Sequence, residues 1–161
     1  MQLRGSEVGA ALSSLQSPET YIGYARAERF VSPGGIARDQ AKTYSGAPLK
    51  LNQWSLQGPW TVGPQSATLR AAPGKIAYRF HARDLHLVLG NPDGKPVRFR
   101  VTIDGKPPGK AAGADVAPDG TGVVDGERLY QLIRQDGTVR DRTFAIEFLD
   151  PGVSAFAFTF G

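Results

Sequence analysis

The chain has 161 residues, an excess of four positive charges and no cysteine. Without cysteine the residues present cannot form a disulfide, an iron–sulfur cluster, a thiolate zinc site or a cysteine nucleophile, so redox chemistry would have to come from another polypeptide or another part of a longer chain. The charge excess is small and scattered, which argues against nucleic-acid binding. No apolar run reaches the length of a membrane span, and residues 1–16 lack the apolar centre of a secretory signal.

The N-terminal part of the chain is predicted to be mostly extended. Residues 1–16 are interpreted as a linker or the end of a preceding domain, and residues 17–161 as one folded domain. A first strand or extended arm over residues 18–30 contains Tyr21 and Tyr24, and Ser32-Pro33-Gly34-Gly35 ends it. A polar passage over residues 39–51 follows.

The middle of the chain carries short segments with the apolar pattern of β-strands. In chain order, strands are expected at residues 51–56, 60–62, 67–69, 75–82, 85–89 and 97–103. Gly58-Pro59 is predicted to be a turn between the first two of these. Residues 90–94, which read GNPDG, are predicted to close a hairpin between the last two.

The C-terminal third supplies most of the aromatic residues. Residues 105–126 are predicted to be a loop with a brief strand near Val123-Val124, and residues 128–134 a buried strand. Residues 143–161 contain five of the eight phenylalanines and are predicted to form a hairpin with one aromatic face per strand. Since that face must be covered, we predict an all-β fold, a two-sheet antiparallel jelly-roll-like β-sandwich of roughly eight to ten strands.

A ligand-binding face is the first functional candidate, because sugar-binding sites combine flat rings with planar polar side chains. The wider set of candidates includes Tyr21, Tyr24, Trp60 and Arg134, and the residues favoured for contact are Trp54, Tyr130, Arg79, His81, Arg98 and Arg100. The last four are predicted to share the outer face of a sheet, where guanidinium groups would favour acidic sugars or carboxylates. The alternative is that the rings belong to the core and that the arginines pair with Glu147, Asp84 or Asp104.

No catalytic, metal or cofactor site is predicted. Strand alternation separates His81 from Asp84, so these residues and His86 do not form a metal triad. The loop aspartates Asp115, Asp119 and Asp125 do not match the spacing of an EF-hand, and nothing places two strand carboxylates together as glycoside hydrolysis requires.

Five blocks occur in order along the chain, at residues 17–24 (SPETYIGY), 80–88 (FHARDLHLV), 98–109 (RFRVTIDGKPPG), 128–134 (RLYQLIR) and 148–153 (FLDPGV). Together they resemble the C-terminal domain of DipZ-type thioredoxin-family proteins, which are related to cytochrome c biogenesis. The resemblance implies a sandwich similar to carbohydrate-binding modules, attached behind an extracytoplasmic thioredoxin-like domain that carries a Cys-x-x-Cys pair. No catalytic residue of the family maps onto this chain.

Two functional hypotheses follow from the resemblance. In the first, the chain is a non-catalytic accessory domain of an extracytoplasmic thiol-disulfide oxidoreductase and binds a cell-envelope glycan or glycosylated protein. In the second, it is a structural interaction or dimerisation module that packs on the thioredoxin-like domain of the same parent, with Tyr21 and Tyr24 as the contact arm. Neither hypothesis includes membrane insertion or nucleic acid.

Overall fold

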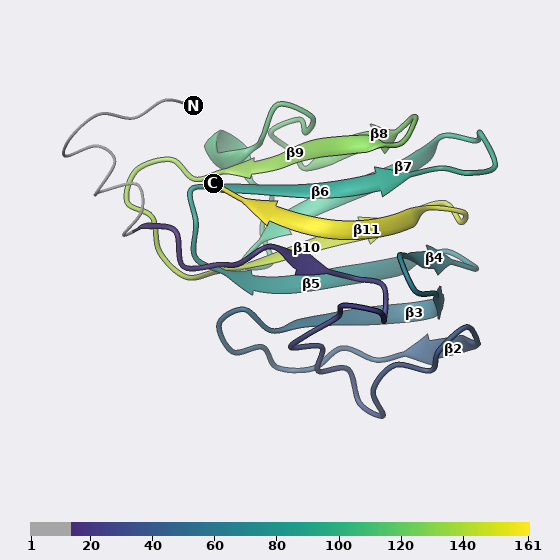
Figure 1. The fold of residues 1–161 in the computed structure, drawn as a ribbon. Helices are drawn as coiled ribbons and strands as arrows, with labels where there is room; N and C mark the ends of the chain where they lie inside the picture. The colour runs from purple at the N-terminus through teal and green to yellow at the C-terminus, as the bar shows by residue number, and fades with distance from the viewer. Residues whose placement is uncertain (1–13) are drawn as a thin grey trace.

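Eleven β-strands and one 3₁₀ turn make up residues 14–161, the part of the chain that the computed structural model describes (Figure 1). The elements are β1 (Thr20–Tyr21), β2 (Ala41–Tyr44), β3 (Trp54–Val62), β4 (Ala67–Leu69), β5 (Gly74–Phe80), β6 (Asp84–Gly90), β7 (Val97–Ile103), η1 (Gly109–Ala111), β8 (Thr121–Val124), β9 (Arg128–Arg134), β10 (Arg142–Phe148) and β11 (Ser154–Phe160). The prediction of an all-β antiparallel sandwich is confirmed, whereas the jelly-roll connectivity stays a prediction.

The strands form two layers that face each other (Figure 1). Sheet A contains β9, β6 and β11 in that order, with β1 and β4 sharing the other side of β11, and continues into the second half of β3 and into β2. Sheet B has the order β8, β7, β10, β5 and the first half of β3. Every pairing between these strands is antiparallel.

Strand β3 belongs to both sheets. Residues 54–57 pair with β5, and residues 60–62 pair with β4. The strand passes from one layer to the other at Gly58, which has a φ of +95° and lies so close to Pro73 that an added Cβ would stand 2.8 Å from the Pro73 carbonyl oxygen. The predicted turn at Gly58-Pro59 is therefore wrong: these residues bend one continuous strand, as glycine permits.

Both predicted hairpins are also wrong. β10 pairs with β5 and β7 in sheet B, whereas β11 pairs with β1, β4 and β6 in sheet A. In the same way β6 lies in sheet A and β7 in sheet B, so the turn at residues 90–94 connects the layers. Period-two alternation fixes which face of a strand is apolar, but it does not distinguish strands that pair side by side from strands that face each other across a core.

The aromatic side chains of β10 and β11 meet in the core, where Phe144 and Phe158 lie edge to face with ring centroids 6.0 Å apart. Phe158 also packs on Tyr78 of β5 at 4.8 Å. Phe156 departs from the predicted aromatic face, because a bulge between Ala155 and Ala157 shifts the register of β11 against β6. Phe156 stays partly exposed, while Phe158 is fully buried. The predicted alternation is thus correct for β10 and wrong at this position of β11.

Two further strands differ from the sequence prediction. β2 forms within the polar passage over residues 39–51, because it pairs with the edge of β3 and needs to bury only Tyr44. β9 was predicted to be buried, yet only Tyr130, Leu132 and Ile133 are buried in it. Each sheet of a two-layer sandwich packs only one face on the core, which explains the half-exposed pattern of β9.

Candidate functional site

The two rings predicted to stack on a ligand are both fully buried. Trp54 packs on Phe30 with ring centroids 4.7 Å apart and donates its indole N–H to the carbonyl oxygen of Glu28. Tyr130 donates its hydroxyl to the carbonyl oxygen of Gly126 at 2.6 Å, and the guanidinium of Arg128 covers its ring at 3.8 Å. Their burial argues against ligand stacking by either ring.

Arg98 lies on the outer face of sheet B as predicted, and it is paired. Its backbone N–H and two guanidinium nitrogens donate to Asp150 at 2.9–3.0 Å. These hydrogen bonds lower the pKa of Asp150 to about 2. The Asp150 carboxylate therefore stays charged at neutral pH and occupies the fork of Arg98.

Arg100 and Arg79 share this outer face but do not gather. β10 lies between their strands, and Arg100 is paired in register with Glu147 while Arg79 is paired with Thr143, whose hydroxyl accepts from its guanidinium at 2.9 Å. Four residues along a strand separate the two levels by about 13 Å. The structure thus spreads the predicted cationic cluster along the sheet.

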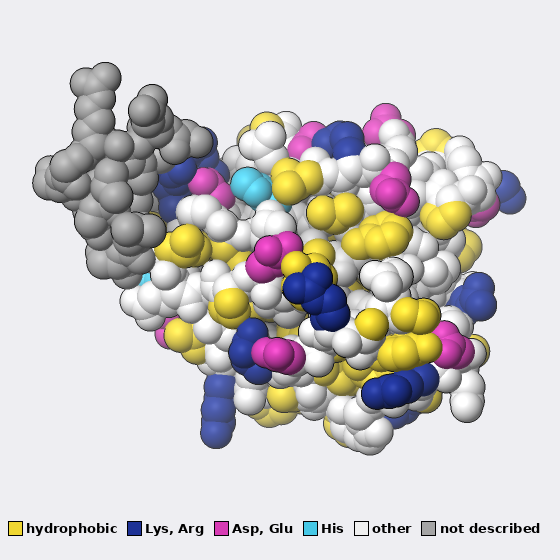
Figure 2. Space-filling view, viewed as in Figure 1, with side chains coloured by type: hydrophobic (Ala, Val, Ile, Leu, Met, Phe, Trp, Pro, Cys, Tyr) yellow, Lys and Arg dark blue, Asp and Glu magenta, His cyan; other side chains and the backbone are white. Residues whose placement is uncertain are grey.

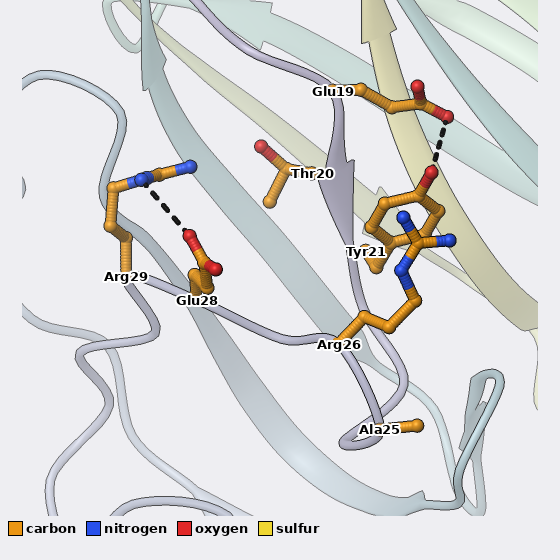
Figure 3. Close-up of a pocket in the computed structure, with 7 residues that line it drawn as sticks. All are labelled: Glu19, Thr20, Tyr21, Ala25, Arg26, Glu28 and Arg29. Atoms are coloured by element: carbon orange, nitrogen blue, oxygen red, sulfur yellow. Dashed lines mark hydrogen bonds and ion pairs between the residues drawn. The ribbon is translucent and has the colours of Figure 1, made fainter.

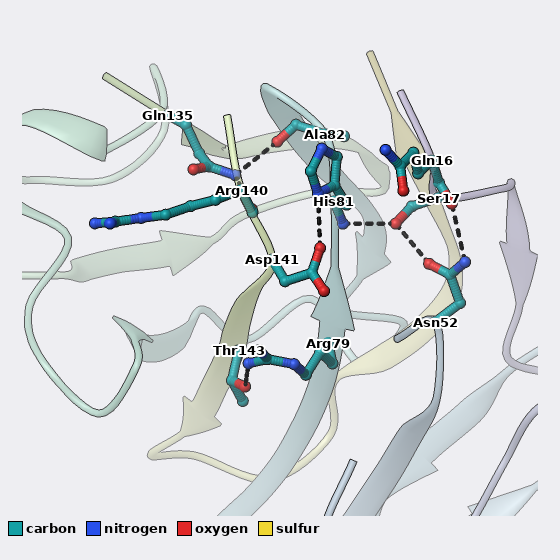
Figure 4. Close-up of polar contacts among 10 residues, drawn as sticks. All are labelled: Gln16, Ser17, Asn52, Arg79, His81, Ala82, Gln135, Arg140, Asp141 and Thr143. Carbon is teal, nitrogen blue, oxygen red and sulfur yellow. Dashed lines mark hydrogen bonds and ion pairs between the residues drawn. The ribbon is translucent and has the colours of Figure 1, made fainter. Parts of the chain in front are cut away.

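His81 contacts residues 16 and 17, close to the first described residue (Figure 4). Its Nδ1 lies 2.6 Å from Oδ1 of Asp141, its backbone N–H donates to Oγ of Ser17, and its carbonyl oxygen accepts from the backbone N–H of Gln16. Ser17 in turn donates to Asn52. These contacts fix residues 16–17 against the end of the sandwich.

Tyr21 and Tyr24, the predicted contact arm, are partly exposed at different places. Tyr21 stands on β1 beside a hollow of about 340 Å³, with the Arg26 guanidinium 3.6 Å above its ring and its hydroxyl donating to Glu19 (Figure 3). Tyr24 donates its hydroxyl to Asp39 at 2.7 Å, a hydrogen bond that raises the pKa of Tyr24.

Tyr21 completes a row of side chains that the sequence analysis did not identify. On the outer face of sheet A, Leu129 of β9 is in register with Val88 of β6, Val88 with Ala157 of β11, and Ala157 with Tyr21 of β1. We call these four residues the apolar row. Leu129 is 40% exposed, and Val88 and Tyr21 are partly exposed. Phe156, at the bulge of β11, lies next to the row in sequence.

Charged and polar groups surround the apolar row. Figure 2 shows hydrophobic side chains along the middle of this face, over β6 and β11. Positively and negatively charged side chains lie around them. The next outward level consists of Gln131, His86 and Thr159. An apolar centre with a polar rim is typical of a protein–protein contact surface. The signal in the sequence was weak, because Val88 and Leu129 lie in segments that are apolar on both faces.

Within residues 14–161 no cluster of three or more His, Asp or Glu side chains has the arrangement of a metal site. No helix of that part of the chain has the length and apolar character needed to cross a membrane. The arrangement offers contact surfaces and hollows.

A comparison with protein families matches residues 17–161 to the model described as "Thioredoxin like C-terminal domain". Two curated relatives, both called Protein DipZ, come from Mycobacterium bovis and Mycobacterium tuberculosis. Each is 29% identical to this chain over 147 residues, which is 90% of the chain and 18% of the relative. The chain therefore spans about a fifth of the length of these relatives.

Proposed function

The chain belongs to the family of thioredoxin-like C-terminal domains, and from this we propose that it is a non-catalytic accessory domain of a larger thiol-disulfide oxidoreductase. The family match over residues 17–161 carries the proposal. The absence of cysteine supports it, because the thiol chemistry then belongs to another part of the parent. By the same resemblance the parent acts outside the cytoplasm, in a process of the cytochrome c biogenesis type.

The partner of the accessory domain is the thioredoxin-like domain of the same parent, and the apolar row is its contact surface. Two observations support this assignment. The curated relatives are about five times longer than the match, which leaves room for such a domain. Residues 16–17 are fixed at one end of the sandwich and lead within a few residues into β1, which carries one end of the row.

A pair of matched substitutions tests this assignment in the parent protein. Leu129 and Val123 are the two large hydrophobic side chains most exposed in the described chain, at 40% and 45%, but only Leu129 lies in the apolar row. We expect Leu129→Asp to weaken the contact and to change the rate at which the parent reduces a disulfide substrate, because a carboxylate would be desolvated in the interface.

Val123→Asp is the control, since Val123 lies on β8 in sheet B. Equal effects of both substitutions, or none from Leu129→Asp, would contradict the proposed contact surface. A change in oligomeric state with Leu129→Asp alone would favour a second copy of the domain as the occupant of the row.

The accessory domain is further proposed to bind a cell-envelope glycan. The rings predicted for it, Trp54 and Tyr130, are buried, so sugar contact would fall to the exposed arginines on the outer face of sheet B. Titration of the chain with envelope polysaccharide tests this: binding that Arg100→Gln weakens would support it, and the absence of any binding would reject it.

A further inference from the structure

A second hollow lies on the outer face of sheet A, beside Val88 and Leu129 of the apolar row and displaced from them along β6 and β9. Its volume is about 300 Å³, and it is formed by β6, β9 and the loop at residues 112–114. The polar side chains that line it are Arg83, Asp84, His86, Gln131 and Arg134. Of these residues only Arg134 was a ligand candidate on sequence grounds.

Among the described residues that line the hollow, two are arginines and one is an aspartate. Asp84 is its one carboxylate and is only 8% exposed. Two guanidinium groups share it: Arg83 donates through Nη2 at 2.9 Å and through Nε at 3.2 Å, and Nε of Arg134 lies 3.8 Å from the other carboxylate oxygen. One carboxylate therefore faces two guanidinium groups.

Of the two guanidinium groups, that of Arg134 makes the looser contact with Asp84. The Arg134 side chain is 60% exposed, and its contact with Asp84 is longer than a hydrogen bond. Within residues 14–161 its guanidinium forms no other ion pair or hydrogen bond, so both terminal amino groups remain available as donors. A guanidinium offers two parallel N–H groups, a geometry that matches the oxygens of a carboxylate or phosphate.

His86 and Gln131 stand beside Arg134 as further polar groups. They face each other in register across β6 and β9, and the described residues offer neither side chain a hydrogen bond. The nearby carboxylate of Asp115 is already engaged by Arg128 at 3.0 Å and by the backbone N–H of Gln131. Burial alone would raise the pKa of Asp115, but these two hydrogen bonds outweigh it and lower the pKa. The Asp115 carboxylate is therefore paired with the guanidinium of Arg128.

Part of the lining of the hollow is a loop with small side chains. Ala112, Gly113 and Ala114 pack directly on β9, where Gly113 donates to the carbonyl oxygen of Leu132. An added Cβ on Gly113 would lie 2.3 Å from the carbonyl oxygen of Gln131, so only glycine permits this approach. The close packing keeps the loop from filling the space in front of Arg134.

We infer that this hollow is a binding site for a small oxyanion, the carboxylate or phosphate group of a ligand. The Arg134 guanidinium binds the anion, and His86 and Gln131 donate or accept hydrogen bonds at its side. The inference depends on charge and geometry within the sandwich, and it holds whether or not the apolar row contacts a thioredoxin-like domain.

Titrations of the ¹⁵N-labelled chain with glucuronate, inorganic phosphate and glucose test the inference by NMR. We expect the amide resonances of Gly113, Ala114 and Gln131 to move with one or both anions and not with neutral glucose. A stronger response to glucuronate identifies a carboxylate ligand, and a stronger response to phosphate identifies a phosphate ligand.

Arg134→Gln should weaken anion binding by about tenfold, because it removes a charge-assisted hydrogen-bond donor. Arg134 is largely exposed, so this variant keeps the fold. Lys95→Gln, at an exposed position beyond the far end of β6, removes an equal charge and should leave the affinity within about twofold of the original. The inference is overturned if millimolar anion leaves these resonances in place, if glucose moves them equally, or if both variants bind alike.

Discussion

At the scale of single residues, the ion pair of Arg98 and Asp150 ties β7 to the turn that follows β10. Asp150 accepts three hydrogen bonds from Arg98, and its pKa in the folded chain is about 2, below the ordinary value of 3.8. A carboxyl group whose pKa is lower in the folded state stabilises that state at pH values above its ordinary pKa. The stabilisation disappears as the pH falls through the pKa of the folded state.

Asp150→Asn should therefore lower the free energy of unfolding at neutral pH and reduce its dependence on pH between about 4 and about 2. Urea denaturation at neutral pH and at several acidic pH values measures both effects. Asp136→Asn, at an exposed loop position, controls for the loss of one surface charge. A variant whose stability falls with acid as steeply as the original chain would show that the pair does not titrate as described.

The sequence predicted the direction of these arginines but not their partners. Strict alternation in β7 placed Arg98 and Arg100 outside, and both are exposed. Asp150 is 52 residues away from Arg98, so no local pattern connects them. The same limit applies to Arg134 and Asp84, which become neighbours only when β9 pairs with β6.

At the scale of elements, the bulge in β11 gives two phenylalanines of one strand different roles. Phe158 is fully buried against Tyr78 and Phe144, while Phe156 is partly exposed. Phe158→Ala should lower the free energy of unfolding by about 3–5 kcal/mol, since it leaves a large cavity between the sheets. Phe156→Ala should cost clearly less. Chemical denaturation of both variants checks this, and equal losses would mean that the register of β11 is different.

The crossing of β3 between the sheets depends on Gly58. Gly58→Ala must accommodate both a positive φ and a Cβ that stands 2.8 Å from a backbone oxygen, whereas Gly94 has a positive φ of 77° with nothing within 4 Å of the added atom. Gly94→Ala should cost about 1 kcal/mol from backbone conformation, and Gly58→Ala distinctly more. Thermal unfolding of the two variants separates the cost of the positive φ, which both share, from the cost of the steric clash with Pro73, which only Gly58→Ala has. Similar midpoints would show that β3 has room to move away from Pro73.

Strand positions were largely predictable, and strand partners were not. β5, β6 and β7 carry clear alternation and lie where the sequence placed them. The turns at residues 90–94 and 150–152 were predicted to close hairpins. The same turn residues can connect two strands of one sheet or two strands of facing sheets, and here they connect the sheets. β2 escaped prediction because its stability depends on the edge of β3 and hardly on its own apolar residues.

At the scale of the whole molecule, the proposed function depends on surfaces that exist only when the strands are in register. The apolar row joins residues from β1, β6, β9 and β11, whose positions in the chain span more than a hundred residues. The sequence supported the fold class and the family resemblance, which the family comparison confirms. It did not reveal the row or the hollow beside it, since both depend on cross-strand neighbours.

The central claim is that the apolar row contacts another domain of the parent protein. Methyl NMR with a soluble paramagnetic agent tests this directly, by comparing the isolated chain with the parent. We predict that the Leu129 methyl signals are attenuated in the isolated chain and protected in the parent, while those of Val123 are attenuated in both. Leu129 signals that are attenuated equally in both proteins would contradict the claim.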